Sequence, residues 1–411
     1  MRSKGLLIVA SSHELPLPTQ FFHCVATSPP YFGLREYRGD QMVNWPEVIY
    51  TPMASYMDFK MYVPAFTCPL GGEPTIEMYT AHMVLVAREV RRVLRDDGVF
   101  WLNLGDSFNG SGGAGGDYRE GGIREGQPTY KGRNLDYLNA GDLIMMPSRL
   151  ALALQADGWI VRQLNIWQKT NPPPEDNNGW RYENNILKRE SWRHTSSHEF
   201  VLQLTKKMGY WGDLERVRLE PTETSPAGPN PRSVFTYSTS SYKGAHYAVY
   251  PGHLIAPLIH ATCPKRVCSV CGQGWSPEVQ RIKHPTRDME AQREKAAERT
   301  GRTDGHVPGP EGQLDNVILL GYRPTCSCGI VEAAESSTKE QAAGWVLDPF
   351  MGSGTTGVVA KEFGVNYVGI DISFQYLDEQ AKVRTKIGQP SKQLDDLPMF
   401  ENNFKSKDID K

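Results

Sequence analysis

Three features are missing from this chain of 411 residues, and each absence disfavours a class of function. No stretch approaches the roughly 18 consecutive apolar residues that cross a bilayer. The formal net charge is only −2, so any contact with nucleic acid must rest on local basic clusters rather than on a basic body. The Gly-x-x-x-x-Gly-Lys phosphate loop is also absent, because Gly352 to Gly357 is followed by Val358, and this disfavours ATP hydrolysis.

The composition is that of a globular protein. A hydrophobic content of 39% is sufficient for a sizeable core. The segment from Met1 to Ala10 is too short and too poorly continued to act as a signal peptide. We therefore expect a cytoplasmic protein, of a bacterial cell or a virus-infected host, without a membrane partner.

The first informative segment lies near the carboxyl end. Trp345 to Leu347 reads as the end of a buried strand, and Gly352 and Gly354 form a tight turn before an apolar helix over 358–363. The glycines remove Cβ atoms where a ligand approaches the backbone, and the helix N-terminus offers unpaired N–H groups. This unit suits a nucleotide-like ligand, although a glycine turn without a ligand is the alternative.

A second strand, Tyr367 to Ile370, follows and ends at Asp371, 17 residues after Gly354. A carboxylate at that position is well placed to accept hydrogen bonds from both hydroxyls of a ribose, as in dinucleotide folds.

The second informative segment lies near the amino end. Phe22 to Thr27 reads as a strand that delivers Ser28-Pro29-Pro30-Tyr31 to the carboxyl edge of a sheet, where open α/β sheets bind ligands. Two prolines cannot continue a helix or a strand, so nearby carbonyls are left free and rigidly aimed. The alternative is a turn that merely ends the strand.

Such a segment can act on an exocyclic amine of cytosine or adenine, which is a poor nucleophile because its lone pair is delocalised. The Ser28 hydroxyl and the Pro29 carbonyl would accept the N–H protons and make the nitrogen more reactive. Tyr31 would stack on the base and orient it.

Together the two segments resemble the amino-methylating DNA methyltransferases, which make N4-methylcytosine or N6-methyladenine. That family carries (Asp/Asn/Ser)-Pro-Pro-(Tyr/Phe/Trp) and Asp-Pro-Phe-x-Gly-x-Gly-Thr, here at 28–31 and 348–355. The catalytic segment comes first, which resembles the β class. Gly98 to Ser107, Asp157 to Pro174 and the Ser197-His198-Glu199-Phe200 block resemble further parts of the family. The resemblance implies a Rossmann-like α/β fold with a mostly parallel sheet and S-adenosylmethionine as cofactor.

The resemblance also implies roles for individual residues. The target base would be handled by Ser28, Pro29, Pro30 and Tyr31. The cofactor would be held by Asp348, Phe350, Gly352, Gly354, Thr355, Asp371 and Tyr250, with Phe350 beside the adenine and Asp371 on the ribose.

Ser28 indicates the target base, since serine at this position in β-class relatives is more often associated with cytosine N4 and aspartate with adenine N6. We expect base flipping out of double-stranded DNA and direct methyl transfer to cytosine N4, with a companion restriction endonuclease as a further partner. Methylation of cytosine C5 needs a thiolate, typically in a Pro-Cys pair that this chain lacks. The alternatives are adenine N6 methylation, a nucleotide-dependent oxidoreductase, or an inactive zinc-containing DNA-binding protein.

Five of the seven cysteines lie in one insert, 262–343. Cys268-x-x-Cys271 and Cys326-x-Cys328 can place four thiolates around Zn²⁺, with a glycine after each pair for a tight knuckle. Disulfides are disfavoured in a reducing cytosol, and free cysteines are the alternative. The insert either contacts DNA or acts as a stabilising clip.

Alternating strand and helix signals predict a mostly parallel sheet. The expected helices cover 80–94 and 146–156, and the expected strands 99–104, 160–167 and 200–205. We expect the following segments: 1–212, the catalytic half, with a Gly-rich loop at 105–141; 213–245, a target-recognition or linker segment; 246–261 and 344–388, the cofactor half; 262–343, the Cys-rich insert; and 389–411, a flexible tail.

Two basic clusters could meet DNA, or could simply be solvated surface. The first consists of Arg181, Lys188, Arg189 and Arg193. It is interleaved with Trp167, Trp180, Tyr182 and Trp192, aromatic residues that suit base stacking but equally suit the edge of the core. The second lies in the Gly-rich loop and consists of Arg119, Arg124, Lys131 and Arg133.

Overall fold

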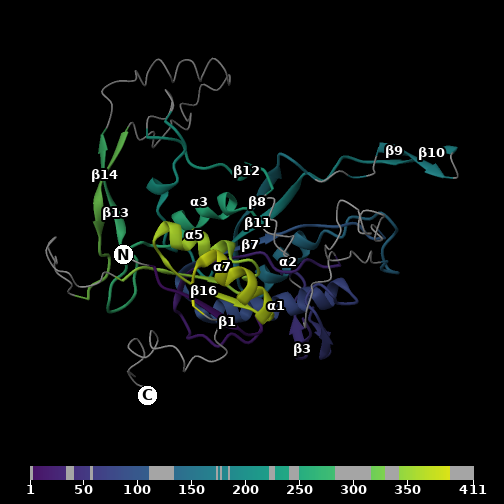
Figure 1. The fold of residues 1–411 in the computed structure, drawn as a ribbon, viewed down its shortest axis with the longest axis horizontal. Helices are drawn as coiled ribbons and strands as arrows, with labels where there is room; N and C mark the ends of the chain where they lie inside the picture. The colour runs from purple at the N-terminus through teal and green to yellow at the C-terminus, as the bar shows by residue number, and fades with distance from the viewer. Residues whose placement is uncertain are drawn as a thin grey trace.

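The predicted strands lie side by side in one eight-stranded sheet at the centre of the computed structural model (Figure 1). In spatial order the strands are β1 (Gly5–Val9), β16 (Asn366–Asp371), β15 (Trp345–Asp348), β2 (Phe22–Thr27), β7 (Leu94–Leu104), β11 (His198–Thr205), β8 (Ile160–Lys169) and β12 (Val234–Tyr237). Every neighbouring pair is parallel except the two that involve β11. The predicted α/β fold with a mostly parallel sheet is therefore confirmed.

The structure describes residues 3–33, 41–55, 59–110, 134–172, 175, 178–183, 186–221, 227–239, 250–282, 316–328 and 342–388. The expected tail at 389–411 and most of the Gly-rich loop lie outside these residues, as does the middle of the Cys-rich insert. None of the helices among the described residues is long and apolar enough to span a membrane.

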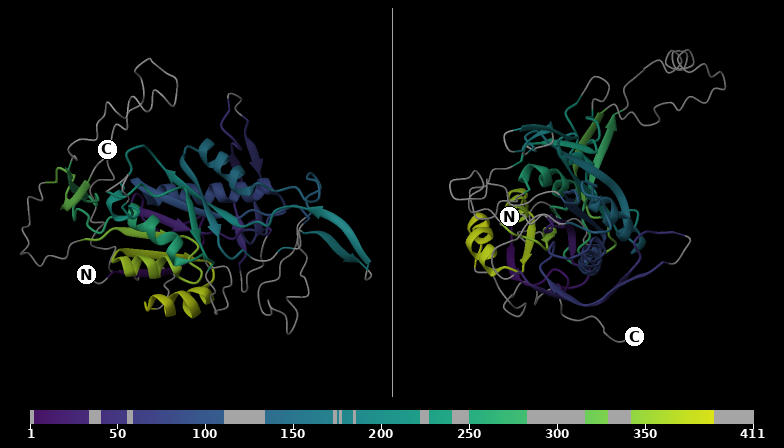
Figure 2. Two further views of the ribbon diagram at one scale, coloured as in Figure 1. Left: turned by 90° about the horizontal axis from the view of Figure 1, so that it is seen from above. Right: turned by 90° about the vertical axis from the view of Figure 1, so that its right-hand side faces the viewer.

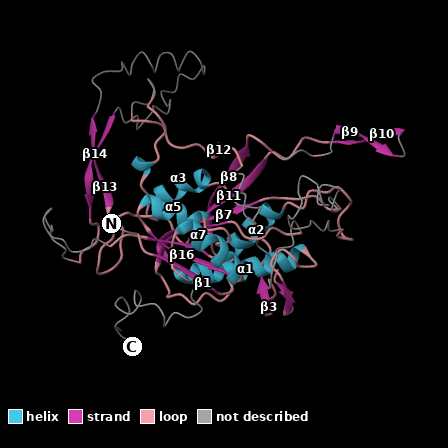
Figure 3. Ribbon diagram, viewed as in Figure 1, coloured by secondary structure: helices cyan, strands magenta, loops and turns pink. Residues whose placement is uncertain are grey.

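Helices cover both faces of the sheet (Figure 3). One face packs against α1 (Ile76–Val93) and α2 (Met146–Ala156), and the other against α3 (Gly252–Thr262) and α5 (Thr355–Phe363). The chain then forms two short helices, α6 (Phe374–Tyr376) and α7 (Lys382–Thr385), joined by a π turn over Leu377–Ala381. All six residues of β2 are buried, as expected for a parallel strand covered on both faces.

The longest helix of the described residues, α1, begins earlier than its apolar pattern indicates. We expected a helix over 80–94, whereas α1 begins at Ile76 because the Thr75 side chain accepts a hydrogen bond from the Met78 N–H and caps the N-terminus. The α2 bounds agree with the expected ones. Strand β1 was not predicted, because its short apolar run shows no alternation of apolar and polar residues.

Two segments from opposite ends of the sequence are neighbours in the sheet. Strand β15 pairs in parallel with β2, with Val346 opposite Cys24 and Leu347 opposite Val25. Because parallel strands end at the same edge of a sheet, the residues that follow β2 and β15 lie close together.

The other described strands form four peripheral two-stranded sheets, and a short 3₁₀ turn, η2, lies at Leu214–Arg216. These sheets pair β3 (Val43–Trp45) with β6 (Phe66–Cys68), β4 (Val48–Tyr50) with β5 (Met61–Val63), β9 (Asn178–Glu183) with β10 (Ile186–Trp192), and β13 (Ser276–Ile282) with β14 (Asn316–Arg323). The β9–β10 and β13–β14 hairpins project at opposite ends of the molecule, as two perpendicular views show (Figures 1 and 2).

Candidate active site at the carboxyl edge of the sheet

The glycine loop after β15 is fixed by the strand beside it. The Asp371 carboxylate, at the end of β16, accepts hydrogen bonds from the Gly352 N–H at 2.9 Å and the Ser373 N–H at 2.8 Å. Burial raises the pKa of Asp371 to about 6. Gly354 ends the loop with a φ of +85° and forms the N-cap of α5. The turn and the carboxylate that the sequence predicts are therefore brought together.

Asp348, the last residue of β15, is a buried hydrogen-bond hub. One carboxylate oxygen accepts from the Thr27 hydroxyl at 2.5 Å and the Phe350 N–H at 3.0 Å. The other accepts from the Tyr250 hydroxyl at 3.1 Å and from the Thr356 hydroxyl. Burial raises the pKa of Asp348, although these donors oppose that shift. Asp348 thus ties the end of β2 to the glycine loop and to α5.

Thr355, Phe350 and Tyr250 lie around this hub. The Thr355 side chain is buried at the first residue of α5 and accepts a hydrogen bond from Arg384 at 3.0 Å. Phe350 is partly buried against the core beneath the loop. Burial, together with the neighbouring Asp348 carboxylate, raises the pKa of Tyr250, so its hydroxyl stays protonated and acts as a donor.

The Ser28-Pro29-Pro30-Tyr31 segment turns directly after β2. The Tyr79 hydroxyl, from α1, donates to the Pro30 carbonyl at 2.9 Å and fixes the turn. The Tyr31 ring lies so close to Gly105 that a Cβ on this glycine would be 2.7 Å from the ring. This close approach explains a glycine directly after β7.

A chain of hydrogen bonds runs from Ser28 to a carboxylate that the sequence did not single out. The Ser28 and Tyr31 hydroxyls are 3.0 Å apart, and Tyr31 donates to Glu199 Oε2 at 2.7 Å. Asn103 Nδ2 donates to the same oxygen at 2.8 Å and to the Tyr31 hydroxyl at 2.7 Å. Because the Tyr31 proton points to the carboxylate, the Ser28 proton points to Tyr31. Asn103 Nδ2 also donates to Ser28 Oγ over a longer distance of 3.4 Å, so the Ser28 oxygen acts as an acceptor in this arrangement.

Glu199 is held ionised by Lys169. The Lys169 ammonium lies 2.6 Å from Glu199 Oε1, and the two side chains are only 16% and 14% exposed. Burial would raise the pKa of Glu199, but Lys169, Tyr31 and Asn103 outweigh it and hold the pKa below its usual range. Both residues occur in segments noted in the sequence, and the signal that could have found them is their position at the ends of neighbouring strands.

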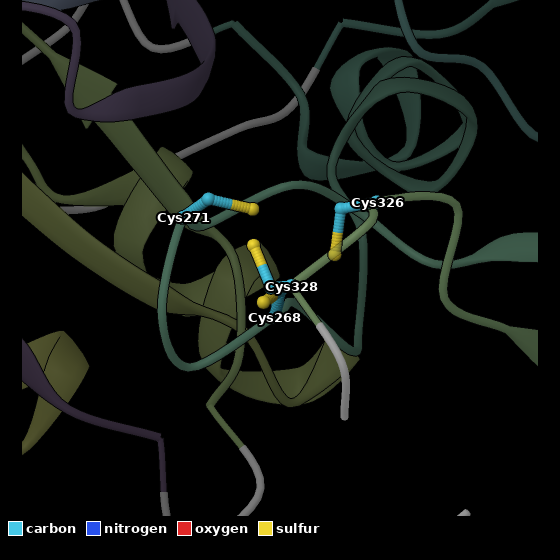
Figure 4. A group of neighbouring side chains, drawn as sticks. All are labelled: Cys268, Cys271, Cys326 and Cys328. Carbon is cyan, nitrogen blue, oxygen red and sulfur yellow. The ribbon is translucent and has the colours of Figure 1, made fainter. Parts of the chain in front are cut away.

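The four predicted zinc ligands also come together. The sulfur atoms of Cys268, Cys271, Cys326 and Cys328 all lie within 4.8 Å of one another (Figure 4). The Val270 N–H donates to Cys268 Sγ at 3.4 Å, as in knuckles that hold thiolates. The donor set and its spacing fit a tetrahedral zinc ion.

The cysteine knuckle is hydrogen-bonded to residues near the amino-terminal ends of β2 and β7 and is linked through β2 to β15. His23, in β2, bonds to the Gly272 carbonyl through Nε2 at 2.8 Å and accepts from the Trp345 N–H through Nδ1 at 3.2 Å. Burial lowers the pKa of His23 to about 4, so the ring is neutral and Nε2 carries the proton. Arg95 also donates to the Cys271 carbonyl at 3.1 Å.

The predicted basic clusters are only partly described. Lys188 and Arg189 are exposed on β10, while Trp167 is buried and donates to the Tyr237 carbonyl, which agrees with the core alternative. The side chains of Trp180, Arg181 and Tyr182 are outside the described part, as are Arg119, Arg124, Lys131 and Arg133.

A model of the N6/N4 DNA methylase family matches residues 22–268 and 330–382. The chain is 29% identical over 380 residues to the type II methyltransferase M.SmaI of Serratia marcescens, covering 90% of this chain and 87% of the relative. It is 28% identical to the type II methyltransferase M.Cfr9I of Citrobacter freundii, covering 88% and 81%. Among solved structures, the cytosine-N4-specific PvuII DNA methyltransferase aligns over 94% of this chain and 88% of its own, with 14% identity and a TM-score of 0.48.

The glycine loop generates a prediction about stability. Gly354→Ala would place a Cβ 2.9 Å from Ala381 Cα at a φ of +85°, whereas Gly364→Ala has a φ of +83° and meets nothing within 4 Å. Both substitutions should cost about 1 to 2 kcal/mol for the left-handed backbone, and Gly354→Ala about 1 to 3 kcal/mol more for the steric overlap. Equilibrium urea unfolding of the two variants measures the difference, and equal losses would contradict the overlap.

Proposed function

This chain belongs to the N6/N4 DNA methylase family and is an S-adenosylmethionine-dependent DNA methyltransferase, and on this premise we propose that its target is the N4 amine of cytosine in double-stranded DNA. Ser28 carries the proposal, because serine in this tetrapeptide is more often associated with cytosine N4 in the β-class enzymes that the chain resembles. We propose that the target base is flipped out of the duplex and binds beside Ser28 and Tyr31, at the carboxyl edge of the sheet.

The residues around the glycine loop fit S-adenosylmethionine, which supplies an electrophilic methyl group on a sulfonium. We propose that Asp371 binds the ribose, Phe350 flanks the adenine, and the backbone of Gly352 and Gly354 approaches the cofactor. The carboxylate oxygens of Asp348 are occupied by protein donors, so we assign Asp348 the task of fixing the loop. Tyr250 and Thr355 are both buried, and we propose that they support the glycine loop on its buried side.

The hydrogen-bond chain supports a mechanism for handling the amine protons. The Ser28 oxygen, whose proton is directed to Tyr31, accepts one N–H of the target amine, and the Pro29 carbonyl accepts the other. When the nitrogen is methylated it must lose one proton. That proton passes to Ser28 Oγ as the Ser28 proton passes to Tyr31 Oη and the Tyr31 proton to Glu199 Oε2. Asn103 and Lys169 keep the carboxylate in position.

The names of the relatives support a place in restriction–modification. M.SmaI and M.Cfr9I are named type II methyltransferases. We propose that a companion restriction endonuclease cleaves the sequence that this enzyme protects.

The proposed target is tested by methyl transfer from labelled S-adenosylmethionine to mixed-sequence duplex DNA, followed by mass spectrometry of the nucleosides. We expect labelled N4-methylcytosine, and we expect Ser28→Ala to lower its formation by about 100-fold or more because the amine loses an acceptor. Labelled N6-methyladenine would overturn the assignment from Ser28 while keeping the reaction type. DNA binding without any methyl transfer would support the inactive alternative.

The proton path is tested by Glu199→Gln, with Glu215→Gln as a matched control. Glu215 is also a half-buried carboxylate in a salt bridge, 2.7 Å from Arg218 and 15% exposed, but it lies on η2. Glu199→Gln should lower kcat by about 10- to 1000-fold, because the path loses its terminal acceptor, while the Kd for S-adenosylmethionine stays unchanged. The control should keep kcat near the wild-type value. A change in KM alone would argue against a part in proton transfer, and cofactor affinity shows that the variant is folded.

We also propose that the four cysteines bind a structural zinc ion. The prediction is about one zinc per chain, which Cys268→Ser should remove, while Cys24→Ala, a buried cysteine of β2 outside the cluster, should retain it. Zinc loss should lower the thermal unfolding midpoint, because the knuckle anchors both β2 and β15 through His23. Metal analysis by mass spectrometry and calorimetry measure these outcomes, and zinc-free wild-type protein with an unchanged midpoint would refute the site.

A further inference from the structure

The β9–β10 hairpin leaves the molecule from the same edge of the sheet as the proposed catalytic residues. It connects the end of β8, at Lys169, to the start of β11, at His198. The Lys169 N–H donates to the Ser197 carbonyl at 2.7 Å and extends the β8–β11 ladder toward the hairpin. Its two ends are therefore linked to the Lys169–Glu199 ion pair that holds Tyr31.

The base of the hairpin has a defined geometry. Glu175 accepts from Arg193 at 2.7 Å and from the Ser196 N–H at 3.2 Å, which joins the outgoing chain to the returning one. The Arg193 guanidinium also lies over the Phe108 ring, 3.9 Å from its centre. These contacts lie at the base of the hairpin, which projects away from the sheet edge (Figures 1 and 2).

Beyond this base, the described side chains of the hairpin are exposed. Trp192 is 66% exposed, Ile186 62% and Leu187 48%, and Lys188 and Arg189 lie between them on the surface. An isolated two-stranded hairpin is marginally stable in water, and exposed apolar groups of this size mark an interaction surface. A partner of this surface must accept both cations and an aromatic ring.

Duplex DNA fits these requirements better than a second copy of the chain. A two-stranded ribbon is narrow enough for the major groove, which is about 12 Å wide, and seven residues of β10 reach roughly 23 Å. Lys188 and Arg189 suit phosphates or base edges, whereas a chain with a net charge of only −2 has little overall attraction for two cations on a second copy of itself. The hairpin also lies at the edge where the target base must enter.

We propose that the β9–β10 hairpin binds the DNA duplex beside the target base, with Lys188 and Arg189 on the nucleic acid and Trp192 against the sugars and bases. The proposal rests on the DNA methyltransferase function and adds a second surface to it. The described part of 213–245, by contrast, supplies β12 as an edge strand of the central sheet.

The test is Lys188→Ala/Arg189→Ala, with Lys4→Ala/Lys207→Ala as a control. The control removes the same charge from exposed residues at the opposite edge of the sheet, before β1 and after β11. Binding to a plasmid-derived duplex is measured over a range of salt concentrations. The hairpin variant should bind about tenfold more weakly, with a salt slope smaller by about 1 to 2, while cofactor affinity stays unchanged. The control should have the wild-type slope.

Trp192→Ala provides an independent variant, which should also weaken DNA binding but leave the salt slope unchanged. Slopes and affinities equal to those of the control would overturn the proposal. A change of oligomeric state in sedimentation, with DNA affinity unchanged, would assign the hairpin to contact between copies and overturn it as well. If the wild-type protein transferred no methyl group, the proposed reaction would fail, yet the DNA-binding comparison would still decide the role of the hairpin.

Discussion

The buried carboxylate of Asp348 is the interaction on which the geometry of the site depends. Burying a carboxylate costs several kcal/mol unless its oxygens are hydrogen-bonded, and here donors come from β2, the glycine loop, α5 and Tyr250. These donors are far apart in the sequence, so the carboxylate is satisfied only when all of them are in place. The same contacts that stabilise the fold thus fix the distance between the Ser28 segment and the glycine loop.

The side chains of the site fall into two groups: those that hold the glycine loop in place, and those that are positioned to contact a substrate. Asp348 and Tyr250 bond to each other and to neighbouring hydroxyls and are buried, so they hold the loop. Ser28 lies at the open end of a directed chain of hydroxyls that terminates at an ionised Glu199. A carboxylate beside an ammonium keeps its charge despite burial, and that charge sets the direction of every proton in the chain.

The sequence predicted the family, the mostly parallel sheet and the gathering of four cysteines, because each depends on local patterns. Strand ends, glycine turns and the Cys-x-x-Cys knuckle are readable from a few adjacent residues. The sequence did not predict the roles of Lys169 and Glu199, since their contact arises from the pairing of β8 with β11 across 30 residues. The His23 bridge to Gly272 is likewise a contact over 249 positions. No local period carries such information, and the roles of the other predicted residues remain proposals.

The adjacency of β2 and β15 has a consequence for how the chain folds during synthesis. Strand β2 leaves the ribosome early, but its neighbour β15 and the donors to Asp348 on α5 follow more than 300 residues later. At about 5 to 20 residues per second, one side of the fully buried strand β2 waits tens of seconds for its partner. Strand β1 waits longer still, because it pairs with β16. A sheet that contains such distant pairs has a high contact order, so the amino-terminal half keeps an unpaired apolar edge until β15 and β16 have been translated.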